Sequence, residues 1–305
     1  MVINNNQKKQ GFYVSSDKVF DLFNYAFFAF LLLIVVYPLY WVVIASISNP
    51  GDIMLGNVTF LPIDINFDGY RIIFIYNRIW MGYRNSIIYT VLGTAISLAL
   101  TLPAGYVASR KDFVGRRLFL IMITITMFFN GGLIPTYLVV RGLGMDNTIW
   151  AIVVPTACSA FNVIISKTFF QSTIPVELLE SAAMDSCSNM RFFFKIALPL
   201  SLSLVAVIAI FTAVGHWNSY FSALIYLRND NLYPLQLILR EILIQQDTSH
   251  MLTDIRHMER QQERMWLAEL IKYGVIIVAS LPMLILYPFL QRYFVKGVMI
   301  GSIKG

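Results

Sequence analysis

Acidic side chains are absent from every long apolar segment of this 305-residue sequence, and charged residues make up only 13% of the whole. An ionisable group deep in a bilayer is costly and usually functional. Proton- or sodium-coupled carriers need such groups or an equivalent ion cage, and intramembrane hydrolases need paired acids, an activated serine or a metal cluster. Their absence argues against a stand-alone channel or secondary carrier that powers itself, and against an intramembrane enzyme.

The sequence also lacks the Gly-x-x-x-x-Gly-Lys-Ser/Thr loop that cradles nucleotide phosphates. If the protein moves a solute against a gradient, ATP and Mg²⁺ must therefore be bound by a separate ATPase subunit, and we expect this chain to bind no cofactor. Only two cysteines are present. Cys158 falls in an apolar segment and Cys187 in a loop, so we expect neither a disulfide nor a metal site.

Apolar residues are abundant, at 57% of the chain, and the mean hydropathy is +0.66. A helix needs about 20 apolar residues to cross the hydrocarbon core of a bilayer. Six segments are long enough: 23–47, 86–107, 118–140, 148–170, 198–225 and 270–290. We therefore predict an all-α, polytopic membrane protein with six transmembrane helices in one domain, residues 23–290. Glycines and prolines inside these segments predict a packed bundle with local kinks.

A cleaved signal peptide is the alternative for the first segment, because Lys8, Lys9 and Lys18 precede it. The apolar stretch is too long for a signal peptide and lacks a clear cleavage site, so we interpret it as a span.

The distribution of lysine and arginine predicts the orientation. The link between the second and third segments is rich in these residues, and short basic loops stay in the cytoplasm. This places residues 1–22, 171–197 and 291–305 in the cytoplasm and 227–269 outside. The net charge of +6 follows from this bias and does not indicate nucleic acid.

Within the outer segment, Leu235, Leu239, Ile242 and Leu243 recur at near-helical spacing before a polar run at 256–264. This pattern predicts a solvated helix on the outer face, with a docking surface for a soluble partner as the alternative.

The cytoplasmic loop at 171–197 has the signals of two short helices. Pro175 suits a first helical position, and Glu177 and Glu180 lie near the positive end of the helix dipole. Four residues share one helical face: Leu179, Ala182, Ala183 and Ser186. A polar turn at 186–189 and a second helix at 191–196 follow, and Pro199 opens the fifth span.

This loop resembles the Glu-Ala-Ala, three residues, Gly, nine residues, Ile-x-Leu-Pro loop of permeases in binding-protein-dependent ABC importers. The matching residues are Glu180-Ser181-Ala182, Ser186 and Ile196-x-Leu198-Pro199. In that family the loop forms coupling helices that sit in a cleft of the ATPase. The resemblance implies ATPase coupling by Glu177, Leu179, Glu180, Ala182, Ala183, Asp185, Ser186 and Arg191. Ser186 departs from the family glycine, so we expect a strained or reshaped turn.

The similarity extends to 129–137, 143–150, 167–175, 216–221 and 291–297, and points to the complex-carbohydrate branch of maltose-type second permease subunits. It implies a type I importer permease fold in the bacterial plasma membrane, with both termini inside. The implied partners are a homologous second permease, ATPase subunits, an external solute-binding protein and a carbohydrate. By the same resemblance the tail at 300–305 reaches the ATPase, unless it is an idle terminus. An ABC exporter half is the remaining alternative, but exporters usually lack this loop.

Polar and aromatic residues in the spans are candidates to line a sugar path: Asn130, His216, Trp217, Asn218 and Tyr220. The alternatives are an interfacial aromatic belt and amide bridges between helices. The partner permease could also supply most of the sugar site.

Overall fold

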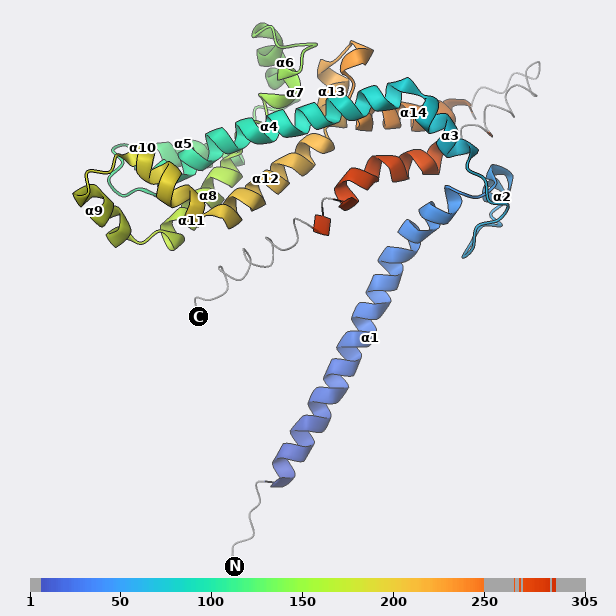
Figure 1. The fold of residues 1–305 in the computed structure, drawn as a ribbon, viewed down its shortest axis with the longest axis horizontal. Coiled ribbons are helices and arrows are strands. Elements are labelled where there is room, and N and C mark those ends of the chain that lie inside the picture. The colour runs from blue at the N-terminus through green and yellow to red at the C-terminus, as the bar shows by residue number, and fades with distance from the viewer. Residues whose placement is uncertain (1–6, 250–265, 267–268, 270, 286, 289–305) are drawn as a thin grey trace, which may run out of the picture. The chain divides into compact units, whose positions relative to one another are not determined.

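The computed structural model describes residues 7–249, 266, 269, 271–285 and 287–288 (Figure 1). Every regular element in these residues is a helix, which confirms the predicted all-α class. The polar run at 256–264 and the tail at 291–305 lie outside the described residues. The chain divides into two compact units, one formed by 1–73 with 253–277 and the other by 74–252 with 278–305.

The first unit contains α1 (Gln7–Ala45), α2 (Pro50–Met54) and the start of α3 (Asp68–Ile75). The apolar part of α1, Lys18–Ala45, has 28 residues and a hydropathy of 2.6. It therefore exceeds the length of about 20 residues that a bilayer requires. Most of its apolar side chains are exposed, as expected of a helix whose solvent is lipid.

A small hydrophobic core packs the end of α1 against the loop that follows it. Ile44, Ala45 and Tyr273 are buried in it. The Trp41 indole N–H donates to the Val58 carbonyl at 2.9 Å, and the Trp41 ring meets Tyr273 edge-on at 5.2 Å. These contacts fix the end of α1 within its own unit.

The second unit is a bundle built along one long helix, α4 (Asn77–Ser109). Its other α-helices are α5 (Arg116–Phe128), α6 (Leu133–Gly142), α7 (Trp150–Val153), α8 (Ala160–Thr173), α9 (Val176–Met184), α10 (Asn189–Phe192), α11 (Leu198–Leu200), α12 (Leu202–Trp217), α13 (Tyr220–Tyr226) and α14 (Leu235–Ser249). Helices α8 and α12 make the most extensive contacts with α4.

Three glycines let other helices approach α4 closely. A side chain at Gly82 would meet α14, one at Gly93 would meet His216 of α12, and one at Gly105 would meet Ser166 of α8. Small residues at helix contacts allow backbones to pack closely in membrane bundles. The glycines at 93 and 105 therefore serve helix packing rather than kinking.

The third, fourth and fifth apolar segments are divided into separate helices, a stronger interruption than the local kinks that we predicted. The third is split into α5 and α6, which meet at 117°, and residues 154–159 interrupt the fourth. The fifth contains an 82° bend after Leu200 and is interrupted again at 218–219. Turn-forming residues lie at the break between α5 and α6. The Asn130 side chain accepts from the Gly132 N–H at 3.0 Å, and Gly132 has φ +87°.

Two helices are long and apolar enough to cross a membrane by length and composition, or up to four if each bent pair counts as one span. This count covers only the described residues. Residues Ile271–Ile285 form a shorter apolar helix. The arrangement of six spans therefore stays a prediction.

The predicted outer helix is present as α14. Its apolar face is buried rather than solvated: Leu235 is fully buried and Leu239 nearly so. Ser86 Oγ accepts from the Leu235 N–H at 2.9 Å, and the Arg78 guanidinium pairs with Glu241 of α14 at 2.8 Å. Packing against α4 thus holds α14 in place.

Replacing Gly105 with alanine should destabilise the bundle, because the new methyl group would overlap Ser166 and lie 3.1 Å from the Lys167 nitrogen. Overpacking of this kind costs about 1–3 kcal/mol. Gly142→Ala is the matched control, since no heavy atom lies within 4 Å of its added Cβ. Thermal unfolding in detergent should show a lower midpoint for Gly105→Ala only. An equal midpoint for the two variants would contradict the close contact.

Candidate functional site

The loop at 171–197 folds as two short helices, as predicted. Helix α9 begins at Val176, and Pro175 is its N-cap with φ −61° and ψ 145°. We predicted Pro175 as the first residue of the helix. Its ψ is extended rather than helical, so the helix begins one residue later. Glu177 lies in the first turn, where the helix dipole favours a negative charge.

Helix α9 ends in a left-handed turn at Ser186, which has φ +55°. The Cys187 N–H donates to the Ala182 carbonyl at 2.9 Å, and the Ser186 N–H donates to the Ala183 carbonyl at 3.0 Å. This pair of bonds is the Schellman motif, whose left-handed position is usually glycine. The turn is therefore strained, one of the two outcomes that we expected, and serine in this conformation costs about 1 kcal/mol.

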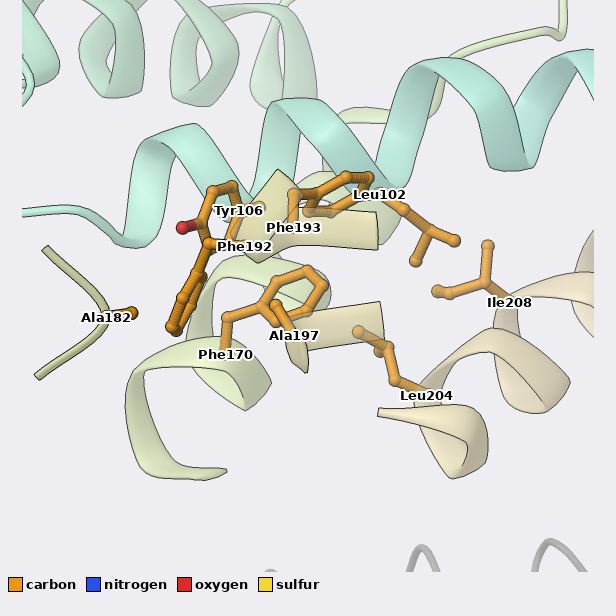
Figure 2. Close-up of a cluster of buried hydrophobic side chains, with 9 residues drawn as sticks. All are labelled: Leu102, Tyr106, Phe170, Ala182, Phe192, Phe193, Ala197, Leu204 and Ile208. Carbon is orange, nitrogen blue, oxygen red and sulfur yellow. The ribbon is translucent and has the colours of Figure 1, made fainter. Parts of the chain in front are cut away.

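An aromatic cluster holds α9 against the bundle. Ala182 is buried and joins Tyr106 of α4, Phe170 of α8 and Phe192 of α10 (Figure 2). The Tyr106 ring meets Phe170 edge-on at 5.6 Å and lies 5.1 Å from the ring of Phe193. Edge-to-face and tilted ring pairs at these distances are favourable. The cluster therefore links α9 to three other helices at once.

The predicted apolar face of α9 is only partly correct. Leu179 and Ala182 pack toward the aromatic cluster, together with Leu178. Ala183 and Ser186 are exposed instead. Ser186 lies past the end of the helix in the left-handed turn, so the helical spacing that placed it on this face no longer applies.

The outer surface of α9 and its turn carries the remaining coupling candidates. Glu177, Glu180 and Asp185 are exposed, and so is Arg191 on α10. Met184 is the most exposed apolar residue of this surface, at 88%. The surface thus combines acidic groups with one flexible apolar side chain.

The second helix differs in detail from the predicted 191–196. Helix α10 starts two residues earlier, because the Ser188 side chain caps it by accepting from the Arg191 N–H at 3.4 Å. A π-helical turn at Phe193–Ala197 follows and leads into α11. Pro199 lacks the N–H that an α-helix would use at this point, which explains the wider turn.

A hollow of about 550 Å³ lies beside α9 at the end of α4, with Glu180, Leu179 and Tyr106 among its lining residues. The Arg110 Nε donates to Asp112 at 2.7 Å, and Arg110 Nη1 donates to the Tyr106 hydroxyl at 3.1 Å. The hydrogen bond from Arg110 holds the pKa of the Asp112 carboxyl below its usual range. Residues 110–112, in the basic loop that follows α4, therefore line the same hollow as α9.

A second hollow, of about 370 Å³, lies among α7, α8, α12 and α13. His216 and Asn218 line it, as two of the five predicted sugar-path residues. Trp217 is buried outside the hollow, and its indole nitrogen has no partner in the part of the chain that the structure describes. Tyr220 and Asn130 do not line it. The structure therefore groups only two of the five.

Both cysteines are free thiols, Cys158 exposed and Cys187 half-buried, which confirms that they do not pair. Among the described residues no three His, Cys, Asp or Glu side chains are grouped so as to hold a metal ion. The expectation that the chain binds no cofactor stays a prediction.

Comparison with known proteins identifies the family. Residues 79–300 match the model of the binding-protein-dependent transport system inner membrane component. This chain belongs to that family. The match begins inside α4 and includes α14, so the loop at 171–197 of the permease lies within the family region.

Relatives of the permease match along nearly its whole length. The polygalacturonan/rhamnogalacturonan transport system permease protein YtcP of Bacillus subtilis is 40% identical, over 95% of this chain and 99% of its own. The arabinooligosaccharides transport system permease protein AraQ of Halalkalibacterium halodurans is 26% identical, over 91% and 94%. A crystal structure of a bacterial ABC transporter involved in the import of the acidic polysaccharide alginate matches with TM-score 0.82 and 31% identity, over 92% of this chain and 98% of that one.

Four aromatic residues against which α9 packs were not predicted from the sequence: Tyr106, Phe170, Phe192 and Phe193. They lie in four different elements, so no spacing within one helix connects them. The run of three phenylalanines at 192–194, directly after the polar turn, was the one available signal. Two of the three are buried and the third is exposed.

Ser186→Gly should stabilise the turn at the end of α9, because glycine adopts a positive φ without steric cost. We expect a gain of roughly 0.5–1 kcal/mol, partly offset by the greater freedom of glycine in the unfolded chain. Slower hydrogen exchange at the Ser186 and Cys187 amides of the permease would report it. Ser186→Val should accelerate exchange there; faster exchange in the glycine variant would mean that the turn is not left-handed in solution.

Proposed function

We propose that this permease imports a carbohydrate, with an oligosaccharide as its substrate, as one subunit of an ATP-driven transporter. The observation that carries the proposal is α9, an exposed acidic helix seated on an aromatic cluster that reaches three other helices. Such a helix suits the transmission of force from a separate motor. The relatives named for polygalacturonan, arabinooligosaccharides and alginate support a carbohydrate.

The proposed complex contains a homologous second permease, ATPase subunits and an external solute-binding protein. ATP and Mg²⁺ bind to the ATPase, and this chain is non-catalytic. The missing phosphate loop and the acid-free apolar segments support this division of work.

The proposed location is the bacterial plasma membrane, with several spans and both termini in the cytoplasm. The arrangement at the end of α4 supports this orientation. The Gln171 amide of α8 donates to the Ser109 carbonyl at 3.2 Å, and Arg116 donates to the Ala108 carbonyl at 2.9 Å. The two loops that we predicted to be cytoplasmic thus share one end of the bundle, where the basic residues gather.

The proposed mechanism transfers a movement of the ATPase to the bundle. ATP binding closes the ATPase pair and draws the α9 helices of the two permeases together. The cluster around Ala182 passes this movement to α4, α8 and α12. The transport cavity between the two permeases then opens to the outside and accepts sugar from the binding protein. Hydrolysis then returns the cavity to its inward-facing state.

The combined change Glu180→Lys and Leu179→Arg tests the coupling role. It reverses the charge at Glu180 and places a cation where Leu179 packs, so the ATPase should no longer bind this surface. We expect sugar uptake to fall at least tenfold and ATPase copurification to drop. Wild-type levels of both would show that α9 does not couple.

Asp68→Lys with Ile65→Arg is the matched control, because both positions are exposed and far from α9 in the sequence. It should keep uptake and ATPase association. The permease reconstituted alone in liposomes should not transport solute, and transport by the isolated chain would favour a channel or secondary carrier instead.

A further inference from the structure

The hollow of about 370 Å³ forms where two helices are interrupted. Thr156 comes from the break between α7 and α8, and Asn218 and Ser219 come from the break between α12 and α13. Irregular backbone at membrane depth is tolerated where it lines a cavity, and transporters place solute sites at such breaks. The volume is within the range of small-molecule sites, about 300–1,000 Å³.

Three hydroxyls of the wall already donate their hydrogens to backbone carbonyls. Thr156 donates to the Ile152 carbonyl at 3.3 Å, Thr212 donates to the Ile208 carbonyl at 2.8 Å, and Ser219 donates to the His216 carbonyl at 2.7 Å. The Asn218 amide nitrogen donates to the Val214 carbonyl at 3.0 Å. A hydroxyl has one donor and two lone pairs. The three hydroxyls therefore keep only acceptor lone pairs for a ligand, whereas the Asn218 amide keeps one N–H donor and its acceptor oxygen.

Of the residues that the structure describes, no aspartate, glutamate, lysine or arginine lines the hollow. A carboxylate offers only acceptors and needs cations or donors when it leaves water. A sugar hydroxyl, in contrast, donates to acceptors of the kind found here. The wall thus suits an uncharged, hydroxyl-bearing ligand surface and disfavours a carboxylate.

His216 supports a ligand-binding role for this wall. Its side chain is only 4% exposed, and its Nε2 has no hydrogen-bond partner within the described residues. Any side chain at Gly93 would collide with the imidazole, so the glycine lets the ring sit in this wall. Phe221, also in the lining, adds an apolar surface for the carbon face of a sugar.

We propose that this hollow holds the uncharged, hydroxyl-bearing face of one sugar unit during transport. The inference rests on the proposed carbohydrate function and adds that this chain contributes directly to the sugar path. If the transported oligosaccharide is acidic, its carboxylates face away from this wall. The sugar contact is then set by Thr156 and Thr212, which sequence analysis did not single out.

The test uses the intact importer in proteoliposomes, with labelled oligogalacturonides and their carboxyl-reduced, neutral forms as probes. Thr156→Val with Thr212→Val keeps the side-chain shapes and removes two acceptors. We expect the KM for uptake to rise roughly tenfold, equally for acidic and neutral probes. Ser222→Ala, a milder change in the same wall, should raise it about threefold.

Thr168→Val is the matched control, because Thr168 donates to the Ile164 carbonyl at 2.9 Å in the same way but on an exposed face of α8. It should leave the KM unchanged. An unchanged KM in all pocket variants would overturn the inference and leave the proposed function intact. A rise confined to the acidic probes would show that the wall binds carboxylates. If the wild-type importer transports neither probe, nor any other glycan of a neutral and acidic panel, the proposed function itself fails.

Discussion

The packing of Ala182 against the rings around Tyr106 is the contact on which the proposed coupling through the second unit depends. It is a small contact for α9, which buries no other residue. Its partners, however, belong to α4, α8 and α10, and burying an aromatic side chain is worth about 1.5–3 kcal/mol. A short helix that could not persist alone in water is thereby fixed to the longest element of the unit.

The attachment of α9 to the bundle bears on how a chain of this composition could be supplied with free energy for transport. The apolar segments carry no acidic residue, and the sequence has no Gly-x-x-x-x-Gly-Lys-Ser/Thr loop. In the proposed transporter, the free energy for uphill transport enters through a surface of this chain. The exposed acidic groups of α9 and Met184 at its end provide a surface that a second protein can hold, and the aromatic cluster behind them provides the connection inward.

The sequence predicted the type of every major element because apolar segments and helix caps are local signals. Pro175, Glu177 and the polar turn at 186–189 placed α9 to within a residue. Glycine and proline predicted local kinks, but not that three apolar segments break into separate helices, because hydropathy averages over the turn-forming residues Asn130 and Gly132. The hydrogen bond that closes this turn, from the Gly132 N–H to the Asn130 side chain, depends on the local conformation, which an average hydropathy does not report.

In the candidate sites, too, residues close in sequence were predictable and residues brought together from separate helices were not. The candidate coupling residues follow one helix and one motif, so spacing alone could predict them. Thr156 and Thr212 line one hollow although they are far apart in sequence, and the aromatic cluster also combines separate helices. No sequence periodicity reports such contacts. The direction of the Thr212 hydroxyl, which decides what the wall can bind, depends on the Ile208 carbonyl one turn earlier.

The most direct measurement of the central claim is a distance between spin labels at Met184→Cys on α9 and Val91→Cys on α4, both exposed, with the two native cysteines replaced. It is made in the assembled importer with and without ATP. If the aromatic cluster links α9 rigidly to the bundle, the distance distribution stays unchanged while the importer cycles. A shift of α9 relative to α4 on ATP binding, with uptake intact, would contradict the account.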